Sequence, residues 1–151
     1  MIKKIFWITL VSLGALLILV VYNYLVAQKA IKNTQPSVLQ TDMVSYPESV
    51  IAGSKPTFIW NVQTPDDLTT SFTTIYWSYI SSPSALTVND SPAAVKYANH
   101  TSDYLSGVFK LPDNFNSRIT VEKTGKIFFR SYAKVGDQNL WSKEYSFTVN
   151  P

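Results

Sequence analysis

The chain has 151 residues, of which none is cysteine and one is histidine, and its formal net charge is +3. The lack of cysteine excludes disulfides, zinc–thiolate sites, iron–sulfur clusters and thiol catalysis. From Tyr46 onward nine Lys or Arg residues balance nine Asp or Glu residues. The C-terminal part therefore has no excess positive charge for nucleic acid, and the surplus lies near the N-terminus, where cations meet lipid phosphates.

Residues 5–27 are the strongest feature of the sequence. These 23 residues carry no charge, and a membrane-spanning helix needs about 20 apolar residues. Trp7 near one end, and Tyr22 and Tyr24 near the other, belong to the residue types that concentrate at membrane interfaces. We expect a cytoplasmic tip at residues 1–4 and a transmembrane helix at residues 5–27, with the lipid bilayer as its partner.

A cleaved signal peptide is the main alternative, because Lys3 and Lys4 precede the apolar run and residues 25–27 (LVA) resemble a cleavage site. Signal peptides usually have an apolar region of about 7–15 residues, which residues 5–21 already exceed. Lysines flank the run equally on both sides. The polar, strand-forming composition of the C-terminal part therefore decides the orientation. We expect a single-pass protein of the cell membrane with an extracytoplasmic C-terminal domain.

Residues 28–45 have no sustained hydrophobic period and include Pro36, so they predict a stalk. From Tyr46 the period changes to two, which indicates half-buried β-strands. The segment 81–92, rich in Ser and Pro, predicts a loop. The predicted strands, in chain order, are residues 50–52, 57–62, 71–80, 94–98, 105–111, 118–122, 126–135 and 140–149.

About seven or eight short strands within residues 46–151 predict an all-β domain, an antiparallel immunoglobulin-like sandwich that follows one transmembrane helix. Uneven strand lengths and the long loop favour a sandwich over an up-and-down barrel. Trp60 and Trp77 share their strand parity with the more apolar residues. We therefore expect both tryptophans on facing inner surfaces of the two sheets.

Several strand segments resemble those of fibronectin type III domains. The motif FIWNV at residues 58–62 resembles the second strand of that family, where a Trp anchors the core, and IYWSY at 75–79 resembles the third. FRSYA at 129–133 is similar to the sixth strand, and WS with YSFTV at 141–149 to the last. The resemblance covers about residues 46–149 and implies a sandwich of the fibronectin type III or a related immunoglobulin-like kind.

Patterns for catalysis or metal binding are scarce. A Ser–His–Asp arrangement needs a histidine, and His100 lies in a predicted loop without a nucleophile-elbow motif. A cupredoxin copper site needs two histidines and a cysteine. Asp66 and Asp67 follow Pro65, a pattern that is typical of a turn. The alternative interpretation of this pair is a calcium site, which needs about 6–8 oxygen ligands. We predict no catalytic residue, no metal and no cofactor.

Strand parity predicts one candidate binding face. If the strands at 71–80 and 126–135 are neighbours in one sheet, Tyr76, Phe128, Arg130 and Tyr132 point outward together. Aromatic and Arg side chains are enriched at protein interfaces. The alternative is that these residues only favour strands, with Arg130 and Glu144 as a cross-strand pair.

These observations predict a non-catalytic binding, adhesion or envelope-assembly domain. A protein partner is favoured, because the candidate face combines aromatic residues with arginine. A cell-envelope polysaccharide is the second candidate, since aromatic platforms also stack on sugar rings. A small membrane-tethered hydrolase is the competing class, and the test for it is whether a pocket brings His100 together with Asp103 or Asp66.

Overall fold

The computed structural model describes residues 14, 16–27 and 38–151. The chain divides into two compact units, Met1–Gln35 and Pro36–Pro151. In the first unit Gly14 and residues 16–27 are helical. Within the described residues, no helix has the length and apolarity that crossing a membrane requires. The predicted tip, residues 1–4, and residues 5–13 and 15 of the predicted transmembrane helix lie outside the described residues.

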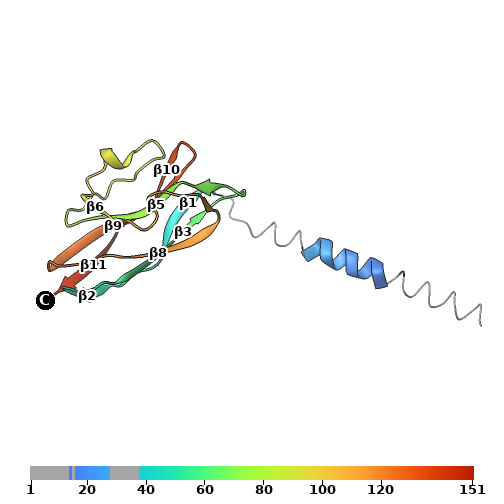
Figure 1. Ribbon diagram of the computed structural model, residues 1–151, viewed down its shortest axis with the longest axis horizontal. Helices are drawn as coiled ribbons and strands as arrows, with labels where there is room; N and C mark the ends of the chain where they lie inside the picture. The colour runs from blue at the N-terminus through green and yellow to red at the C-terminus, as the bar shows by residue number, and fades with distance from the viewer. Residues whose placement is uncertain (1–13, 15, 28–37) are drawn as a thin grey trace, which may run out of the picture. The chain divides into compact units, whose positions relative to one another are not determined.

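In residues 38–151, the described part of the second unit, the regular elements are β-strands and one short 3₁₀-helix (Figure 1). The elements are β1 (Gln40–Ser45), β2 (Ser49–Ile51), β3 (Thr57–Gln63), β4 (Thr69–Thr70), β5 (Phe72–Ser78), η1 (Pro92–Ala94), β6 (Asn99–His100), β7 (Phe109–Lys110), β8 (Asp113–Arg118), β9 (Gly125–Val135), β10 (Gln138–Trp141) and β11 (Tyr145–Asn150). One sheet has the strand order β1-β3-β8. The other has the order β2-β11-β9-β5-β6, with β10 also paired to β9, and β4 pairs separately with β7.

The two larger sheets pack face to face over one core, and this arrangement is an immunoglobulin-like sandwich. The chain passes from one sheet to the other between β1 and β2. β2 pairs in parallel with β11, and the other strand pairs of the described domain are antiparallel. The predicted sandwich is confirmed, and β5 and β9 are neighbours in one sheet, which is the condition that the candidate binding face required.

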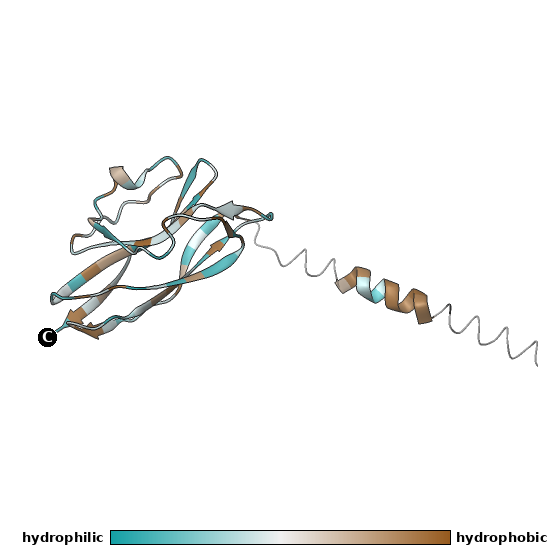
Figure 2. Cartoon of the chain, in the orientation of Figure 1, coloured by the Kyte–Doolittle hydropathy of each residue, from teal (hydrophilic) through white to brown (hydrophobic). Residues whose placement is uncertain are grey.

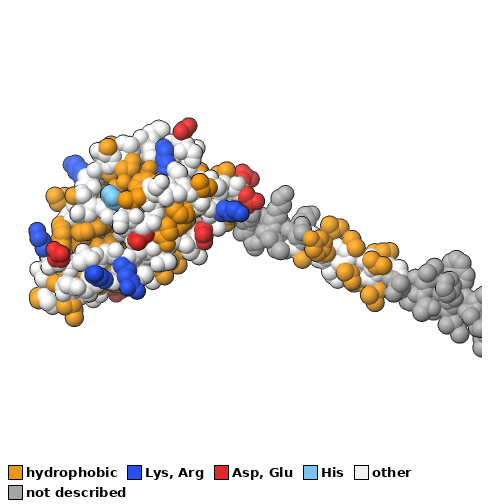
Figure 3. All heavy atoms as spheres, viewed as in Figure 1, with side chains coloured by type: hydrophobic (Ala, Val, Ile, Leu, Met, Phe, Trp, Pro, Cys, Tyr) orange, Lys and Arg blue, Asp and Glu red, His pale blue; other side chains and the backbone are white. Residues whose placement is uncertain are grey.

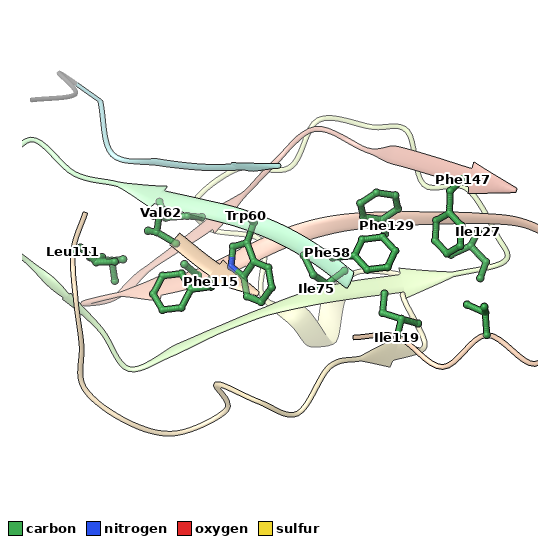
Figure 4. Close-up of a cluster of buried hydrophobic side chains, with 14 of the residues drawn as sticks. Phe58, Trp60, Val62, Ile75, Leu111, Phe115, Ile119, Ile127, Phe129 and Phe147 are labelled. Carbon is green, nitrogen blue, oxygen red and sulfur yellow. The ribbon is translucent and has the colours of Figure 1, made fainter. Parts of the chain in front are cut away.

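Alternate residues of the facing strands build the core (Figure 4). Trp60 in β3 is fully buried. Its ring stacks on Phe115 of β8 with centroids 5.9 Å apart, and its indole N–H donates to the Thr73 hydroxyl at 2.8 Å. Trp77 in β5 packs against the same core but is only half-buried. Both tryptophans therefore lie on the side of their sheets that strand parity predicts.

The predicted stalk at 28–45 is wrong at its C-terminal end, because residues 40–45 form β1; residues 28–37 lie outside the described residues. β1 pairs with β3, so the domain begins before Tyr46. Thr41 is 4% exposed, and its hydroxyl lies 2.8 Å from the Asn61 carbonyl oxygen and 3.0 Å from the Ser131 hydroxyl. The inward position at the start of β1 is thus polar, and a hydrophobic period does not reveal such a strand.

Other predicted strands shift or divide. The strand predicted at 118–122 is replaced by β8, which ends at Arg118, and the one predicted at 105–111 shortens to β7. The predicted strand at 94–98 is absent, since η1 and an irregular stretch precede β6. The run 140–149 divides into β10 and β11. It breaks at residues 142–144 because the Ser142 carbonyl accepts from Arg130 at 2.7 Å and the Ser142 hydroxyl accepts from the Ser131 amide at 2.9 Å.

Candidate functional site

The residues predicted to form an exposed face do lie on neighbouring strands, where Tyr76 pairs with Arg130 and the flanking pairs bring in Tyr132 and Phe128. The exposure predicted for them is wrong. Only 7% of Tyr76, 2% of Arg130 and 2% of Tyr132 is exposed, and Phe128 is half-buried. Residues 81–97 belong to the long connection between β5 and β6 (Figure 1), and Tyr97 of this segment packs with Tyr76 and Tyr132; we call the segment the covering loop.

Arg130 holds the covering loop to the sheet. Its Nη2 donates to the carbonyl oxygens of Ser82 at 2.8 Å and Ser84 at 2.9 Å, and its Nε donates to the Tyr97 hydroxyl at 2.8 Å. Both ends of the loop are therefore fixed by one guanidinium, whose third nitrogen bonds to Ser142. A planar group with several donors can satisfy such a set of acceptors. The role of Arg130 in the structure is to anchor the loop.

Glu144 completes this network from the other side. Its carboxylate accepts from the Ser81 hydroxyl, the Ser82 amide and the Tyr97 hydroxyl, each at 2.6 Å. Burial acts to raise the pKa of Glu144, but these hydrogen bonds and the nearby Arg130 charge outweigh it and hold the pKa below its usual value. Burial and the bond to Glu144 in turn raise the pKa of Tyr97.

The middle of the covering loop is fixed by β10. The Val88 carbonyl accepts from the backbone and side-chain amides of Asn139, both at 3.1 Å, and the Asp90 carbonyl accepts from the Trp141 indole at 2.8 Å. Asn139 also accepts from the Tyr132 hydroxyl at 2.7 Å, and burial raises the pKa of Tyr132 to about 12. The predicted face is thus a second, smaller core.

The lowered pKa of Glu144 predicts how pH affects the loop. A group whose pKa is lower in the folded state stabilises the protein above its unfolded pKa, about 4.3 for Glu, and loses that effect as pH falls through the folded pKa. We expect Glu144→Gln to lower the melting temperature by about a few degrees at pH 7. The difference from wild type should shrink toward zero below about pH 4. Melting curves of both proteins from pH 3 to pH 7 test this, and a difference that is independent of pH would contradict it.

A second feature is open to solvent. A groove of about 580 Å³ runs between the two sheets, at the edges formed by β6 and β8. One wall consists of His100 and residues 101–103, the other of residues 116–120, and Trp77 lies between them. Ligand sites commonly have volumes of about 300–1,000 Å³. Figure 3 shows the single histidine at the surface. This groove is the candidate site.

The groove brings His100 and Asp103 together, which is the arrangement the hydrolase alternative requires. However, the Ser117 hydroxyl donates to the Asp103 carboxylate, and His100 Nδ1 lies 3.0 Å from the Thr101 carbonyl oxygen. Within the described residues, no hydrogen bond or ion pair joins the His100 ring to a serine or to Asp103. The geometry needed for a base-activated nucleophile is therefore not assembled.

Asp66 and Asp67 are exposed in the loop after β3 and do not line the groove. Within residues 14, 16–27 and 38–151, no cluster of three or more His, Cys, Asp or Glu side chains is placed to hold a metal ion. What the groove offers instead is hydrogen-bonding side chains around one half-buried aromatic ring.

The fold defines the chain as an immunoglobulin-like β-sandwich protein. No protein-family model matches it, and no relative is found among curated proteins. Similar solved structures include the PKD domain of an M14-like peptidase from Thermoplasmatales archaeon SCGC AB-540-F20, with 12% identity, a TM-score of 0.48 and coverage of 74% of this chain and 94% of that one. The sulfur carrier protein SoxY from Chlorobium limicola f thiosulfatophilum has 13% identity, a TM-score of 0.41 and coverages of 83% and 96%. A superoxide reductase (neelaredoxin) from Ignicoccus hospitalis has 12% identity, a TM-score of 0.41 and coverages of 80% and 86%.

Proposed function

We propose that this chain is a membrane-anchored, single-pass protein that presents a non-catalytic binding domain outside the cytoplasm. The observation that mainly supports this proposal is the apolar helix of the first unit. The large apolar side chains of residues 16–27 are 47–73% exposed, and most of this helix is hydrophobic (Figure 2). Side chains of this kind need an apolar surrounding, and the uncharged run at 5–27 has the length for a bilayer.

A protein is the proposed partner of the domain. The domain has nine Lys or Arg residues against ten Asp or Glu residues, so it has no excess positive charge, and the groove has no assembled catalytic geometry. The open groove supplies backbone edges and polar side chains, which suit a polypeptide. The finer assignment, a fibronectin type III-like domain, rests on the strand motifs of the sequence. An envelope polysaccharide is the second candidate, because Trp77 presents an aromatic ring among polar groove residues.

The anchor predicts how the chain behaves in membranes. We expect the full chain to stay in the membrane fraction after alkaline carbonate extraction, because the apolar side chains of its helix would be exposed to water outside the bilayer. Replacing Leu17 and Leu19 by Lys should release most of it, since a charge near the centre of a spanning helix costs about 2.5–3.5 kcal/mol. Leu17→Val with Leu19→Val is the matched control and should remain bound.

The location of the domain has its own test. In intact cells stripped of any outer barrier, externally added protease should digest the domain. Protection of the domain, a mature N-terminus at Gln28, or carbonate extraction of the wild type would each contradict part of the proposal. Chemical crosslinking in the native membrane, followed by mass spectrometry, tests for a protein partner; polysaccharide without protein would favour the second candidate.

A further inference from the structure

The sheet β1-β3-β8 ends at β8 without a further strand. In the constant-type immunoglobulin sandwich the corresponding sheet has four strands. Other sheet edges here are short or irregular: β2 has three residues, β6 has two, and β1 has a register shift between Met43 and Ser45. β8 has six residues, a regular register with β3, and neither Pro nor Lys. Short strands, irregular register, Pro and Lys are the features by which proteins usually prevent an edge strand from pairing with another chain. β8 has none of them.

The hydrogen bonds show which backbone groups of β8 are free. The amides of Ile119 and Val121 donate to the carbonyls of Pro56 and Ser54, on the side of β3. Because backbone groups alternate along a strand, odd-numbered residues face β3 and even-numbered residues face outward. The outward amide of Asn114 donates to the Asp113 carboxylate. Asn116 and Arg118 lie opposite Ile59 and Thr57 of β3 in positions without a backbone hydrogen bond, and within the described residues no backbone hydrogen bond is made by Asn116, Arg118 or Thr120.

These free backbone groups face the groove. Residues 116–120 form one of its walls, so the open space lies along the unpaired edge of β8. The opposite wall at residues 100–103 is joined to β8 by the Asp103–Ser117 hydrogen bond, which lies on the core side of the edge because the Ser117 side chain is buried. A space bounded on both sides suits a single extended chain better than the flat edge of a second folded domain.

The charged residues in the groove walls indicate which side chains the extended chain carries. Arg118 is exposed and has no hydrogen-bond or ion-pair partner within the described residues, and it lines the groove. The Asp103 carboxylate, in contrast, already accepts from Ser117. A carboxylate on the incoming segment could therefore pair with Arg118, while small or apolar side chains on its other face contact Trp77 and Ile119.

We propose that β8 accepts an extended, carboxylate-bearing segment of a partner protein as an added strand. The segment forms backbone hydrogen bonds with Asn116, Arg118 and Thr120 and occupies the groove. Main-chain bonds supply affinity in this mode, and pockets for alternate side chains supply specificity. The inference rests on the proposed protein-binding function and names the site and the form of the partner.

The test uses the full chain in detergent micelles and a phage-displayed library of peptides about nine residues long. This length exceeds that of the edge segment 116–120, with which the peptide would pair. Selected peptides are synthesised and their binding is measured by fluorescence anisotropy. Asn116→Pro and Thr120→Pro each remove an outward amide and spare the amides that bond β3, so the fold should persist. Asn116→Ser and Thr120→Ser are matched controls that keep the amide.

We expect each proline variant to weaken peptide binding by about tenfold or more and each serine control to change it by less than about threefold. Arg118→Glu should weaken acidic peptides most. Amide hydrogen exchange by NMR gives a second readout that needs no variant. Peptide should protect the amides of residues 116, 118 and 120, whereas those of 117 and 119 are protected beforehand.

Peptides that bind proline variants and wild type equally, or that leave the three amides unprotected, would overturn strand addition and leave the proposed binding function intact. Failure to select any peptide would also overturn it. A partner crosslinked in the native membrane would then still support the broader proposal. Protection of the same amides in a dimer of the chain without peptide would assign the edge to a second copy and overturn the partner-segment inference.

Discussion

Replacing Trp60 by Ala is expected to remove a large part of the stability of the domain. The side chain is fully buried between the two sheets, stacks on Phe115 and donates to Thr73 of the opposite sheet. Truncating a buried Trp costs about 3–5 kcal/mol, because transfer energy and packing are both lost. Domains typically have about 5–15 kcal/mol in total. Urea unfolding followed by circular dichroism measures the change.

Two variants serve as controls for Trp60→Ala. Trp60→Phe should cost less, since it keeps most of the ring contact and loses the bond to Thr73. Trp77→Ala should also cost less than Trp60→Ala, because Trp77 is half-buried and lines the groove. If Trp77→Ala lowers the free energy of unfolding as much as Trp60→Ala or more, Trp77 is packed as tightly as a fully buried residue, which would contradict its half-buried position.

Replacing Arg130 by Ala is expected to have the second large effect. The guanidinium is 2% exposed and donates to three carbonyl oxygens and to Tyr97. Removing it leaves these acceptors without a donor beneath the covering loop, and losing one member of a buried charged network costs about 3–5 kcal/mol. The loop should then detach from the sheet. Limited trypsin digestion measures this directly, because Lys96 lies within the loop.

We expect Arg130→Ala to be cleaved at Lys96 much faster than wild type under conditions where both remain folded. Lys134→Ala is the matched control and should resist cleavage, because Lys134 lies on the same strand but its side chain donates to the Asp137 carbonyl at 2.7 Å and not to the covering loop. Melting of Arg130→Ala within about a degree of wild type, with unchanged digestion, would contradict the anchoring role. That outcome would reinstate Arg130 as a surface residue.

Strand parity correctly placed Tyr76, Arg130 and Tyr132 on the same face of their sheet but did not reveal their burial. Parity depends only on the alternation of side chains along a strand, which local sequence specifies. Burial depends on where residues 81–97 go, and these residues show no hydrophobic period. Tyr97 joins this cluster from the far end of the loop. The length of this segment is the one sequence signal that could have indicated a structural role, because long loops without secondary structure are uncommon in compact domains.

The groove between β6 and β8 could not be predicted from the sequence, for a related reason. Its walls come from β6 with the residues after it and from β8 with the residues after it, and these segments are polar and contain no motif. The sequence placed a loop around His100 but did not show that it stands opposite residues 116–120. Such a site is defined by which strand lies at the edge of each sheet.

The sequence by itself determined the all-β sandwich, the inward positions of Trp60 and Trp77, and the uncharged run at residues 5–27. Each of these follows from a period or a composition, which short-range physics sets. Only the tertiary structure decided that residues 40–45 are a strand, that the covering loop buries Arg130, and that β8 is a free edge. These features depend on hydrogen bonds between residues distant in sequence, such as Thr41 with Ser131 or Arg130 with Ser82, and no local pattern encodes such pairs.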